Sequence, residues 1–257
     1  MRLLTLLENT CECEDLIPQH GLSLYIETGN RKILFDMGQD DTFIRNGEKL
    51  GVDLSQVDLA ILSHGHYDHG GGLKAFLQIN EKAPVYLHTD AFDSYFNGTE
   101  KYIGLDTSAQ EDPRLIVTRG SMELAEGLTL HDCNEQAWSF DSWGLNRLEG
   151  ENFRPDDFRH EQYLLVEEGE KRILISGCSH KGIVNIARHF SPDILIGGFH
   201  LSKQENLREL ETVCRQLLAT NTCYYTGHCT GEKQFAFMKN LMGDRLQKLS
   251  TGILIEV

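Results

Sequence analysis

A ten-residue segment, Ser63-His-Gly-His-Tyr-Asp-His-Gly-Gly-Gly72, holds three imidazoles and a carboxylate within six consecutive positions. Imidazole nitrogen and carboxylate oxygen are the ligands that Zn²⁺ and related divalent ions accept, and alternate residues of a tight loop can face two different ions. The spacing therefore predicts a two-metal site whose ligands are His64, His66, Asp68 and His69. A surface histidine cluster that binds metal adventitiously is the alternative. The position of the segment, directly after an apolar run and before three glycines, disfavours it.

The residues around this segment suggest how it is held and what it binds. The apolar run at 57–63 predicts a strand that ends at the first histidine. We expect Gly65 and the glycines at 70–72 to provide the backbone freedom that the loop needs. We also expect the N–H groups of residues 70–72, ahead of a helix at Leu73, to meet an anionic group of the substrate.

Strand and helix patterns alternate in both halves of the chain. Two pairs of β-rich runs, 22–28 with 31–38 and 161–168 with 171–177, are joined by the turn dipeptides Gly29-Asn30 and Gly169-Glu170 and predict two hairpins. Apolar runs predict further strands at 84–89, 128–133, 193–199, 223–227 and 253–257. Helices are expected after Gly72, at 181–190, at 232–242 and from Leu207 onward, the last behind a capping box of Ser202 and Glu205. The alternation predicts an α/β fold in which helices cover sheet layers.

The stretch from 91 to 160 differs from the rest. It is polar, lacks clean periodicity and carries both tryptophans, Trp138 and Trp143. Long ordered loops in compact domains are usually functional, so we interpret it as an insertion that caps the active site. A plain surface excursion is the alternative.

Composition limits the class of protein. A chain of 257 residues with 40% hydrophobic content is expected to form one domain, residues 1–257. Acidic residues outnumber Lys and Arg by 39 to 24, a net charge of −15, so nucleic acid is not an expected partner. We expect a cytoplasmic protein, because the number of cysteines is odd, at seven, and the first segment does not resemble a signal peptide. We expect no membrane span, because no apolar run approaches about 20 residues. The oligomeric state stays open.

The chain resembles the metallo-β-lactamase superfamily, whose hallmark is the His-x-His-x-Asp-His motif after a strand. Further segments resemble one subgroup, which includes the archaeal 7,8-dihydropterin-6-methyl-4-(β-D-ribofuranosyl)aminobenzene-5′-phosphate synthase and uncharacterised hydrolase-like relatives. These segments are Gly21–Leu24, Leu34–Gly38, Ser176–His180, Gly197–Leu201 and His228–Gly231. The resemblance implies a four-layer αββα sandwich with two metal ions at one edge, between the two sheets.

The resemblance also implies ligands beyond the motif. His228 matches the late histidine of the superfamily. At the position of the bridging carboxylate this chain instead has Cys178 and His180, and a thiolate and an imidazole are both sound zinc ligands. We predict all three as ligands, and allow that either Cys178 or His180 contacts a ligand instead of the metal.

Three further residues are expected near the metals, in contact with a ligand or with substrate, and for His160 a direct bond to the metal stays open. Asp36 stands where the family places an aspartate that can hold a ligand histidine by its second nitrogen. His160 falls near the position of the family's middle histidine, and a loop histidine is an almost equal alternative. His200 ends a strand and is expected to contact substrate.

These residues predict a hydrolase for a small, phosphate-bearing or otherwise anionic metabolite. Two divalent ions, zinc first with manganese or iron as alternatives, would activate a water, and Asp68 would accept its proton. Phe199, Trp138 or Trp143 could stack on a substrate ring. A synthase that acts on a dihydropterin diphosphate with phosphate loss is the first alternative. An iron-dependent redox enzyme is the second, disfavoured because the reducing diiron relatives carry Glu in place of His66.

Overall fold

The computed structural model describes residues 1–29 and 31–257, and the described chain forms two compact units. Unit 1 comprises Met1–Arg119, Gly144–Gln162 and Ser250–Val257, and unit 2 comprises Gly120–Trp143 and Tyr163–Leu249. The expected insertion at 91–160 is thus divided between the units. Its role as a cap, and the single domain at 1–257, stay predictions. Asn30, half of the first predicted turn dipeptide, lies outside the described residues.

Unit 1 is built on a mixed sheet of seven described strands. In order across the sheet they are β18 (Leu254–Glu256), β1 (Arg2–Leu7), β2 (Ser23–Thr28), β3 (Arg31–Phe35), β4 (Leu59–Ile61), β5 (Val85–His88) and β8 (Leu115–Thr118). The strands from β3 to β8 run parallel, and the remaining pairs are antiparallel. The carboxyl ends of β3, β4 and β5 therefore lie at one edge, where the predicted motif begins.

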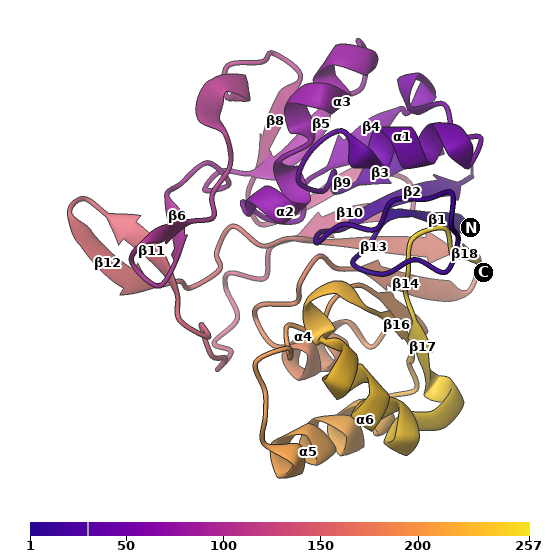
Figure 1. Ribbon diagram of the computed structural model, residues 1–257, viewed down its shortest axis with the longest axis vertical. Helices are drawn as coiled ribbons and strands as arrows, with labels where there is room; N and C mark the ends of the chain where they lie inside the picture. Colours follow the sequence, from indigo (N-terminus) through magenta and orange to yellow (C-terminus); the bar gives the residue numbers. More distant parts are fainter. Residues whose placement is uncertain (30) are drawn as a thin grey trace. The chain divides into compact units, whose positions relative to one another are not determined.

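Helices cover one face of this sheet (Figure 1). They are α1 (Thr42–Lys49), α2 (Tyr67–Gly70), α3 (Leu73–Ile79) and the single turns η1 (Leu54–Gln56) and η2 (Thr107–Ala109). Phe43 of α1 and Phe76 of α3 are fully buried in one apolar cluster with Leu34 of the sheet. Unit 1 also holds a small antiparallel sheet of β12 (Asn152–Pro155), β11 (Leu145–Glu149), β6 (Tyr95–Asn97) and β7 (Lys101–Tyr102).

Unit 2 repeats the plan with a second mixed sheet. Its described strands, in order, are β17 (Leu246–Lys248), β16 (Cys223–Thr226), β15 (Ile194–Ile196), β14 (Lys171–Ile175), β13 (Tyr163–Glu168), β10 (Leu128–His131) and β9 (Ser121–Ala125). Strands β14 to β17 are parallel, and the others pair antiparallel. The helices are α4 (Ile183–Phe190), α5 (Leu207–Leu218), α6 (Glu232–Met242) and the turns η3 (His228–Thr230) and η4 (Gly243–Arg245). They pack over one apolar cluster that includes Phe190, Leu217 and Met238.

The predicted strands and helices are observed, most with somewhat shorter bounds and α6 with the predicted ones, and two expectations need correction. The capping box is wrong: Asn206 is the N-cap of α5, and its side chain accepts a hydrogen bond from the Arg208 N–H at 3.1 Å. Ser202 instead donates its backbone N–H to the Cys229 carbonyl at 3.0 Å. The segment 91–160 is also richer in strands than its composition suggests, because only β10 among β6–β12 was predicted.

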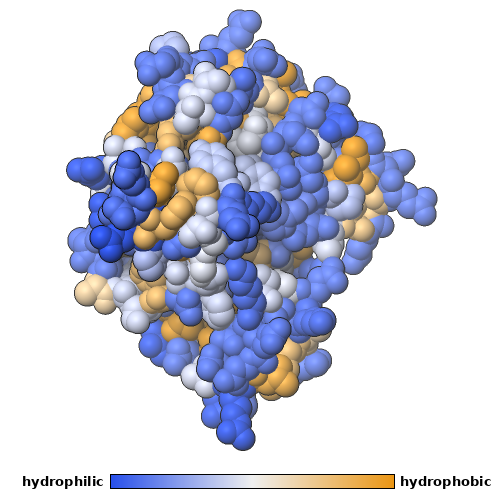
Figure 2. Space-filling model, turned by 60° about the vertical axis from the view of Figure 1, so that its left-hand side comes forward, coloured by the Kyte–Doolittle hydropathy of each residue, from blue (hydrophilic) through white to orange (hydrophobic). Residues whose placement is uncertain are grey.

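The surface agrees with the polar composition of the chain. The face shown in Figure 2 is largely hydrophilic, and its hydrophobic residues form small separate groups. Among the described residues, no helix combines the length and the apolar character needed to cross a membrane.

Thr226 links the loops that follow β15 and β16, and its removal should loosen them. Its hydroxyl is buried and lies 2.7 Å from the Gly197 carbonyl and 2.6 Å from the Thr230 hydroxyl. Thr226→Val keeps the side-chain shape but leaves both partners short of a bond, so we expect a loss of about 1–3 kcal/mol in unfolding free energy. Urea denaturation measures it. Thr212→Val, on the exposed side of α5, is the matched control, and an equal loss in both variants would contradict the role of Thr226.

Candidate metal centre

The predicted motif forms a buried cluster in unit 1, just after β4. His64 and His69 are fully buried, and His66 and Asp68 are 4% and 8% exposed. The His64 ring lies 4.6 Å from the His66 ring and 4.1 Å from the His69 ring, centroid to centroid. The motif thus gathers three imidazoles at the carboxyl edge of the parallel strands.

Asp36, at the end of β3, holds this cluster. Its side chain is fully buried, and one carboxylate oxygen accepts a hydrogen bond from the Ser63 N–H at 2.7 Å. The other lies 2.7 Å from both the Ser63 hydroxyl and His69 Nδ1. Because Nδ1 of His69 faces this carboxylate, Nε2 is the nitrogen left for a metal. Asp36 therefore makes the contact expected of it, and the role of His69 as a ligand stays a prediction.

The glycines of the motif serve close packing, not backbone freedom. Gly71 and Gly72 have φ of −61° and −77°, which any residue adopts. A Cβ at Gly65 would collide with the Ala91 carbonyl oxygen, and one at Gly70 would lie 2.7 Å from Leu105 Cδ2. The expectation that these glycines provide backbone freedom is therefore wrong. The motif needs glycine because other segments of the same chain pack directly against it.

The expected anion site at residues 70–72 is also absent from the described structure. The three N–H groups donate to the carbonyls of His66, Tyr67 and Gly38 at 3.0, 2.8 and 3.2 Å. All three N–H groups are therefore already hydrogen-bonded to backbone carbonyls, and none is left to donate to a substrate.

His160 supports the motif from the side. Its Nδ1 accepts a hydrogen bond from the Gly65 N–H at 2.9 Å, so its proton sits on Nε2, which lies 3.2 Å from an Asp156 oxygen. The Tyr95 ring stacks on it at 3.9 Å. His66, Asp156 and His160 place possible ligand atoms within 4.8 Å of one another. Asp156 was not predicted, and its spacing of four residues from His160 was the available signal.

Electrostatics favour a neutral His66. Burial lowers the pKa of His66 to about 3, and the electrostatic interaction with the nearby His160 ring acts in the same direction. Burial by itself would raise the pKa of the Asp156 carboxyl. The interactions with His160 and His66 outweigh burial, so the pKa of Asp156 lies below its usual value. A neutral imidazole beside an ionised carboxylate is the protonation state that a metal ligand needs.

Asp68 has a neighbour that sequence reasoning missed. Nε2 of His20 lies 3.2 Å from an Asp68 carboxylate oxygen. The Leu22 N–H donates to the Asp68 carbonyl at 3.2 Å, and a Cβ on Gly21 would collide with that carbonyl oxygen. The loop at 20–22 therefore fixes the backbone of Asp68. No motif marks His20, because its contact joins residues 48 positions apart.

Unit 2 carries a second cluster at the carboxyl ends of β14, β15 and β16. Cys178, His180 and His228 are buried there, and His200 is partly buried. Among non-glycine residues, Ser179, His200 and His228 adopt left-handed φ of 57°, 50° and 45°. Such conformations cost roughly 1–3 kcal/mol each and persist where surrounding contacts impose them, most often at functional sites. The cluster also contains Cys229, which was not predicted although it follows His228.

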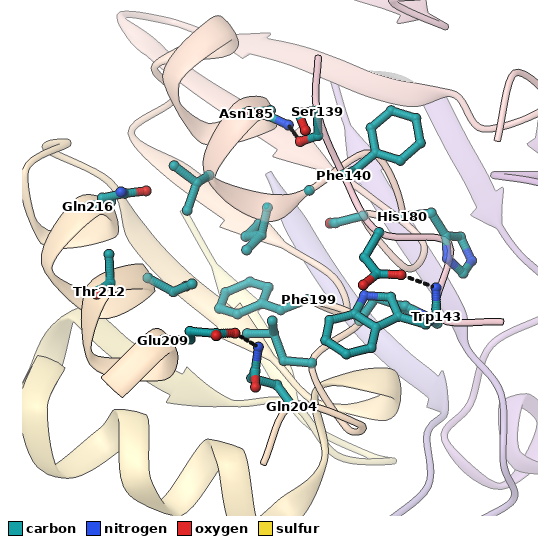
Figure 3. Close-up of a pocket in the computed structure, with 18 of the residues that line it drawn as sticks. Ser139, Phe140, Trp143, His180, Asn185, Phe199, Gln204, Glu209, Thr212 and Gln216 are labelled. Atoms are coloured by element: carbon teal, nitrogen blue, oxygen red, sulfur yellow. Dashed lines mark hydrogen bonds between the residues drawn. The ribbon is translucent and has the colours of Figure 1, made fainter. Parts of the chain in front are cut away.

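A cavity of about 430 Å³ opens beside this cluster, within unit 2 (Figure 3). Phe140, Trp143 and Phe199 line it, and so do His180 and His200. Polar groups that line it include Asn185 and Arg188. Trp143 is partly exposed in this lining, whereas Phe199, 1% exposed, packs in the apolar core of unit 2, and the stacking role of either residue stays a prediction. Trp138 packs instead against the unit 2 core, with its ring 5.4 Å from His189.

Comparison with known proteins places the chain in a family. The model of the metallo-β-lactamase superfamily matches residues 16–134. A 7,8-dihydropterin-6-methyl-4-(β-D-ribofuranosyl)-aminobenzene-5′-phosphate synthase of Methanocaldococcus jannaschii is 30% identical, over 93% of this chain and 90% of the relative. The chain belongs to the metallo-β-lactamase superfamily. The fold agrees: the structure of Tm1679, a metal-dependent hydrolase of the β-lactamase superfamily, matches 100% of this chain and 99% of its own at 28% identity and a TM-score of 0.84. Zn²⁺-bound PqqB from Methylobacterium extorquens, at 12% identity and a TM-score of 0.58, shares the fold alone.

As a member of this superfamily the chain has a mixed sheet flanked by helices in each unit, and its buried donors fit divalent ions. In unit 1 the fit rests on three clustered imidazoles, the low pKa of His66 and the support of His69 by Asp36. Neutral nitrogen and ionised oxygen donors are what zinc accepts. The remaining predicted ligands, Cys178, His180 and His228, lie in unit 2, and their assignment to a metal stays a prediction.

The support of His69 by Asp36 can be tested apart from catalysis. Asp36→Asn replaces the carboxylate that orients His69, so we expect metal affinity to fall by about 10–100-fold. Competition with a chromogenic chelator measures it, and circular dichroism verifies folding. Asp53→Asn, at an exposed N-cap, is the matched control and should bind metal like the unaltered chain. Unchanged affinity in a folded Asp36→Asn protein would contradict this role.

Proposed function

We propose that this protein is a metal-dependent hydrolase that acts on a small anionic metabolite at a site with two divalent ions. The buried cluster of His64, His66, Asp68 and His69 carries the proposal. A protein does not bury three imidazoles and a carboxylate together unless they are paired, hydrogen-bonded or bound to a metal. Tm1679, a metal-dependent hydrolase by its own description, supports the reaction class.

Each residue of the cluster has a distinct part in this proposal. Divalent ions bound there would lower the pKa of water toward neutrality and polarise the oxygen under attack. His64, His66 and His69 supply neutral nitrogens. Asp68, 12% exposed at its side chain, is placed to take up a proton, and His20 at 3.2 Å can pass it toward solvent because its side chain is 53% exposed.

The cavity in unit 2 supports a substrate with a ring and an anionic group. Its aromatic residues can enclose a ring, and Arg188 on α4 offers a guanidinium at an exposed position. Lys181 is a poorer partner for the anion, because its buried amine donates to the Asp132 carbonyl at 2.5 Å and to Asn134 Oδ1 at 2.8 Å.

A synthase-like reaction is the second candidate. The archaeal synthase, similar over 93% of this chain, favours it. In this reaction the same site would eject pyrophosphate, because the C–O bond of a dihydropterin diphosphate breaks as the new carbon bond forms. Hydrolysis of simple esters would then be weak, whereas metal binding would be retained.

One experiment separates these candidates. The protein is purified without added metal, analysed for metal content, and screened against phosphomonoesters, phosphodiesters, lactones and thioesters. We expect about two equivalents of zinc or manganese and hydrolysis of at least one class. His66→Ala should lower activity by at least about a hundredfold, because it removes one ligand without unpairing the motif backbone. His189→Ala, an exposed position in α4, is the control and should keep full activity.

The other outcomes contradict the proposal in defined ways. Iron as the bound metal, without hydrolysis, would support a redox enzyme. Zinc or manganese without hydrolysis of any substrate class would support the synthase-like reaction. Full activity in a folded His66→Ala protein would remove the motif from catalysis.

A further inference from the structure

A segment of unit 2, residues 132–143, follows β10 and contributes to the lining of the cavity in that unit. We call this segment the cavity loop. The Lys181 amine donates to the Asp132 carbonyl at 2.5 Å, and the Asn185 amide donates to the Ser139 carbonyl at 3.1 Å. Lys181 precedes α4 and Asn185 lies in its first turn. The first part of the cavity loop is therefore tied to the start of α4.

The cavity loop ends at Trp143, whose backbone is strained. Its φ of 54° is left-handed, which is a genuine outlier for a bulky residue and persists only where other contacts impose it. The Trp143 N–H donates to an Asp141 carboxylate oxygen at 2.7 Å, and the Lys203 amine donates to the Trp143 carbonyl at 2.7 Å. Because Trp143 is only partly buried, these two bonds hold it where core packing alone would not. Residues strained in this way gather at ligand-binding sites.

These features distinguish Trp143 from the other aromatic residues of the region. Phe199 is 1% exposed and belongs to the apolar core of unit 2. Trp138 packs against that core, with its ring 5.4 Å from the His189 ring. Phe140 lines the cavity as Trp143 does, but without a left-handed φ. Trp143 is therefore the aromatic residue of the lining that combines partial exposure with an imposed backbone conformation.

The rest of the lining suits a ring next to this indole (Figure 3). Val184 of α4 and Val213 of α5 line the cavity and are only partly buried against the core. The volume of about 430 Å³ falls in the range of about 300–1,000 Å³ that is usual for small-molecule pockets. Aromatic rings pair in offset-stacked or edge-to-face geometries, and such pairs add to the free energy that burial of apolar surface provides. A planar ring therefore gains more from this lining than an aliphatic group of the same size.

We propose that Trp143 determines the substrate class of the unit 2 cavity: a small anion with a planar aromatic ring, which stacks on the indole while the anionic group pairs with Arg188. Lys203 is a positioning residue, since it acts through the Trp143 carbonyl. His180, a predicted metal ligand, lines the same cavity, so the ring is held in the cavity that this ligand also lines. The inference rests on the proposed function, for which it names the substrate class.

Two phosphonates of similar size test this substrate class. Phenylphosphonate carries a planar ring and cyclohexylphosphonate does not. Both present the same anion, and neither is hydrolysed like an ester, because a C–P bond replaces the ester bond. Titration calorimetry of the unaltered protein should give a Kd about fivefold lower for phenylphosphonate. In Trp143→Asn, which removes the ring and keeps a residue type that tolerates left-handed φ, the two Kd values should be equal.

Variants of Lys203 separate positioning from a general effect on stability. Lys203→Met removes the donor to the Trp143 carbonyl and should bring the ratio of the two Kd values toward one. Lys203→Arg can still donate to a carbonyl and should restore the ratio. Lys233→Met, at an exposed position in α6, is the matched control and should leave the ratio unchanged. A loss of stability alone would weaken the binding of both phosphonates alike, so an unchanged ratio in Lys203→Met would overturn the role of Lys203.

Nuclear magnetic resonance shows which ring the ligand contacts. The two tryptophans of the chain give two indole N–H signals, and Trp143→Asn assigns them. Phenylphosphonate should shift the Trp143 signal, and the Trp138 signal is the internal control. A shift of the Trp138 signal alone, equal Kd values in the unaltered protein or binding of neither phosphonate would overturn the proposal.

These readouts do not depend on turnover, so the two proposals can fail separately. A protein that hydrolyses esters but binds both phosphonates equally would keep the proposed function and overturn the role of Trp143. A protein that prefers phenylphosphonate through Trp143 but hydrolyses no ester would support the substrate class and contradict the hydrolytic reaction.

Discussion

The Asp36 carboxylate is the constraint on which the motif of unit 1 depends. A fully buried carboxylate is costly unless each of its oxygens is bonded, and here Ser63 and His69 provide the bonds. Ser63 stands at the end of the segment that follows β4, so its backbone bond fixes where the motif begins relative to β3. The bond to His69 then fixes the ring at the end of the motif. One side chain thereby ties both ends of the seven-residue segment Ser63–His69, and α2 begins within this segment at Tyr67.

Both units place their donors at the carboxyl ends of parallel strands, but they hold them in different ways. In unit 1 no non-glycine residue of the motif itself has a positive φ, although Asp36 before it has a φ of 61°, and the motif contains glycines because other chain segments cross it closely, as Ala91 does at Gly65. In unit 2 the backbone itself is strained, with non-glycine residues at positive φ such as His200 and His228. Strain of this kind persists only if the contacts among the three loops exceed its cost, and those contacts are the bonds through Thr226, Thr230 and Cys229.

The sequence predicts features that depend on near neighbours and misses those that depend on distant ones. The motif, the apolar strand before it and helix α4 are recognisable because their signals lie within about ten residues. The start of α5 is not, because the Ser202 N–H is engaged by the Cys229 carbonyl and leaves capping to Asn206. Likewise the sequence predicts that Gly65 provides backbone freedom, which is wrong. Glycine is needed there because a Cβ would collide with the Ala91 carbonyl, and the sequence does not reveal that contact. His20 and Cys229 act through contacts with residues 48 and 51 positions away.

An anionic substrate is compatible with a net charge of −15 because the two act over different distances. At physiological ionic strength, charges separated by more than about 8 Å of solvent are largely screened, so surface carboxylates slow the approach of an anion but do not set its affinity. Affinity depends on groups within the cavity. There the Glu209 carboxylate is already bonded to Gln204 at 2.6 Å and to Asn206 at 2.9 Å, whereas Arg188 lies at an exposed position in the lining. The proposed small anionic substrate is therefore compatible with the acidic composition, because Arg188 in the cavity lining could pair with an anion at short range.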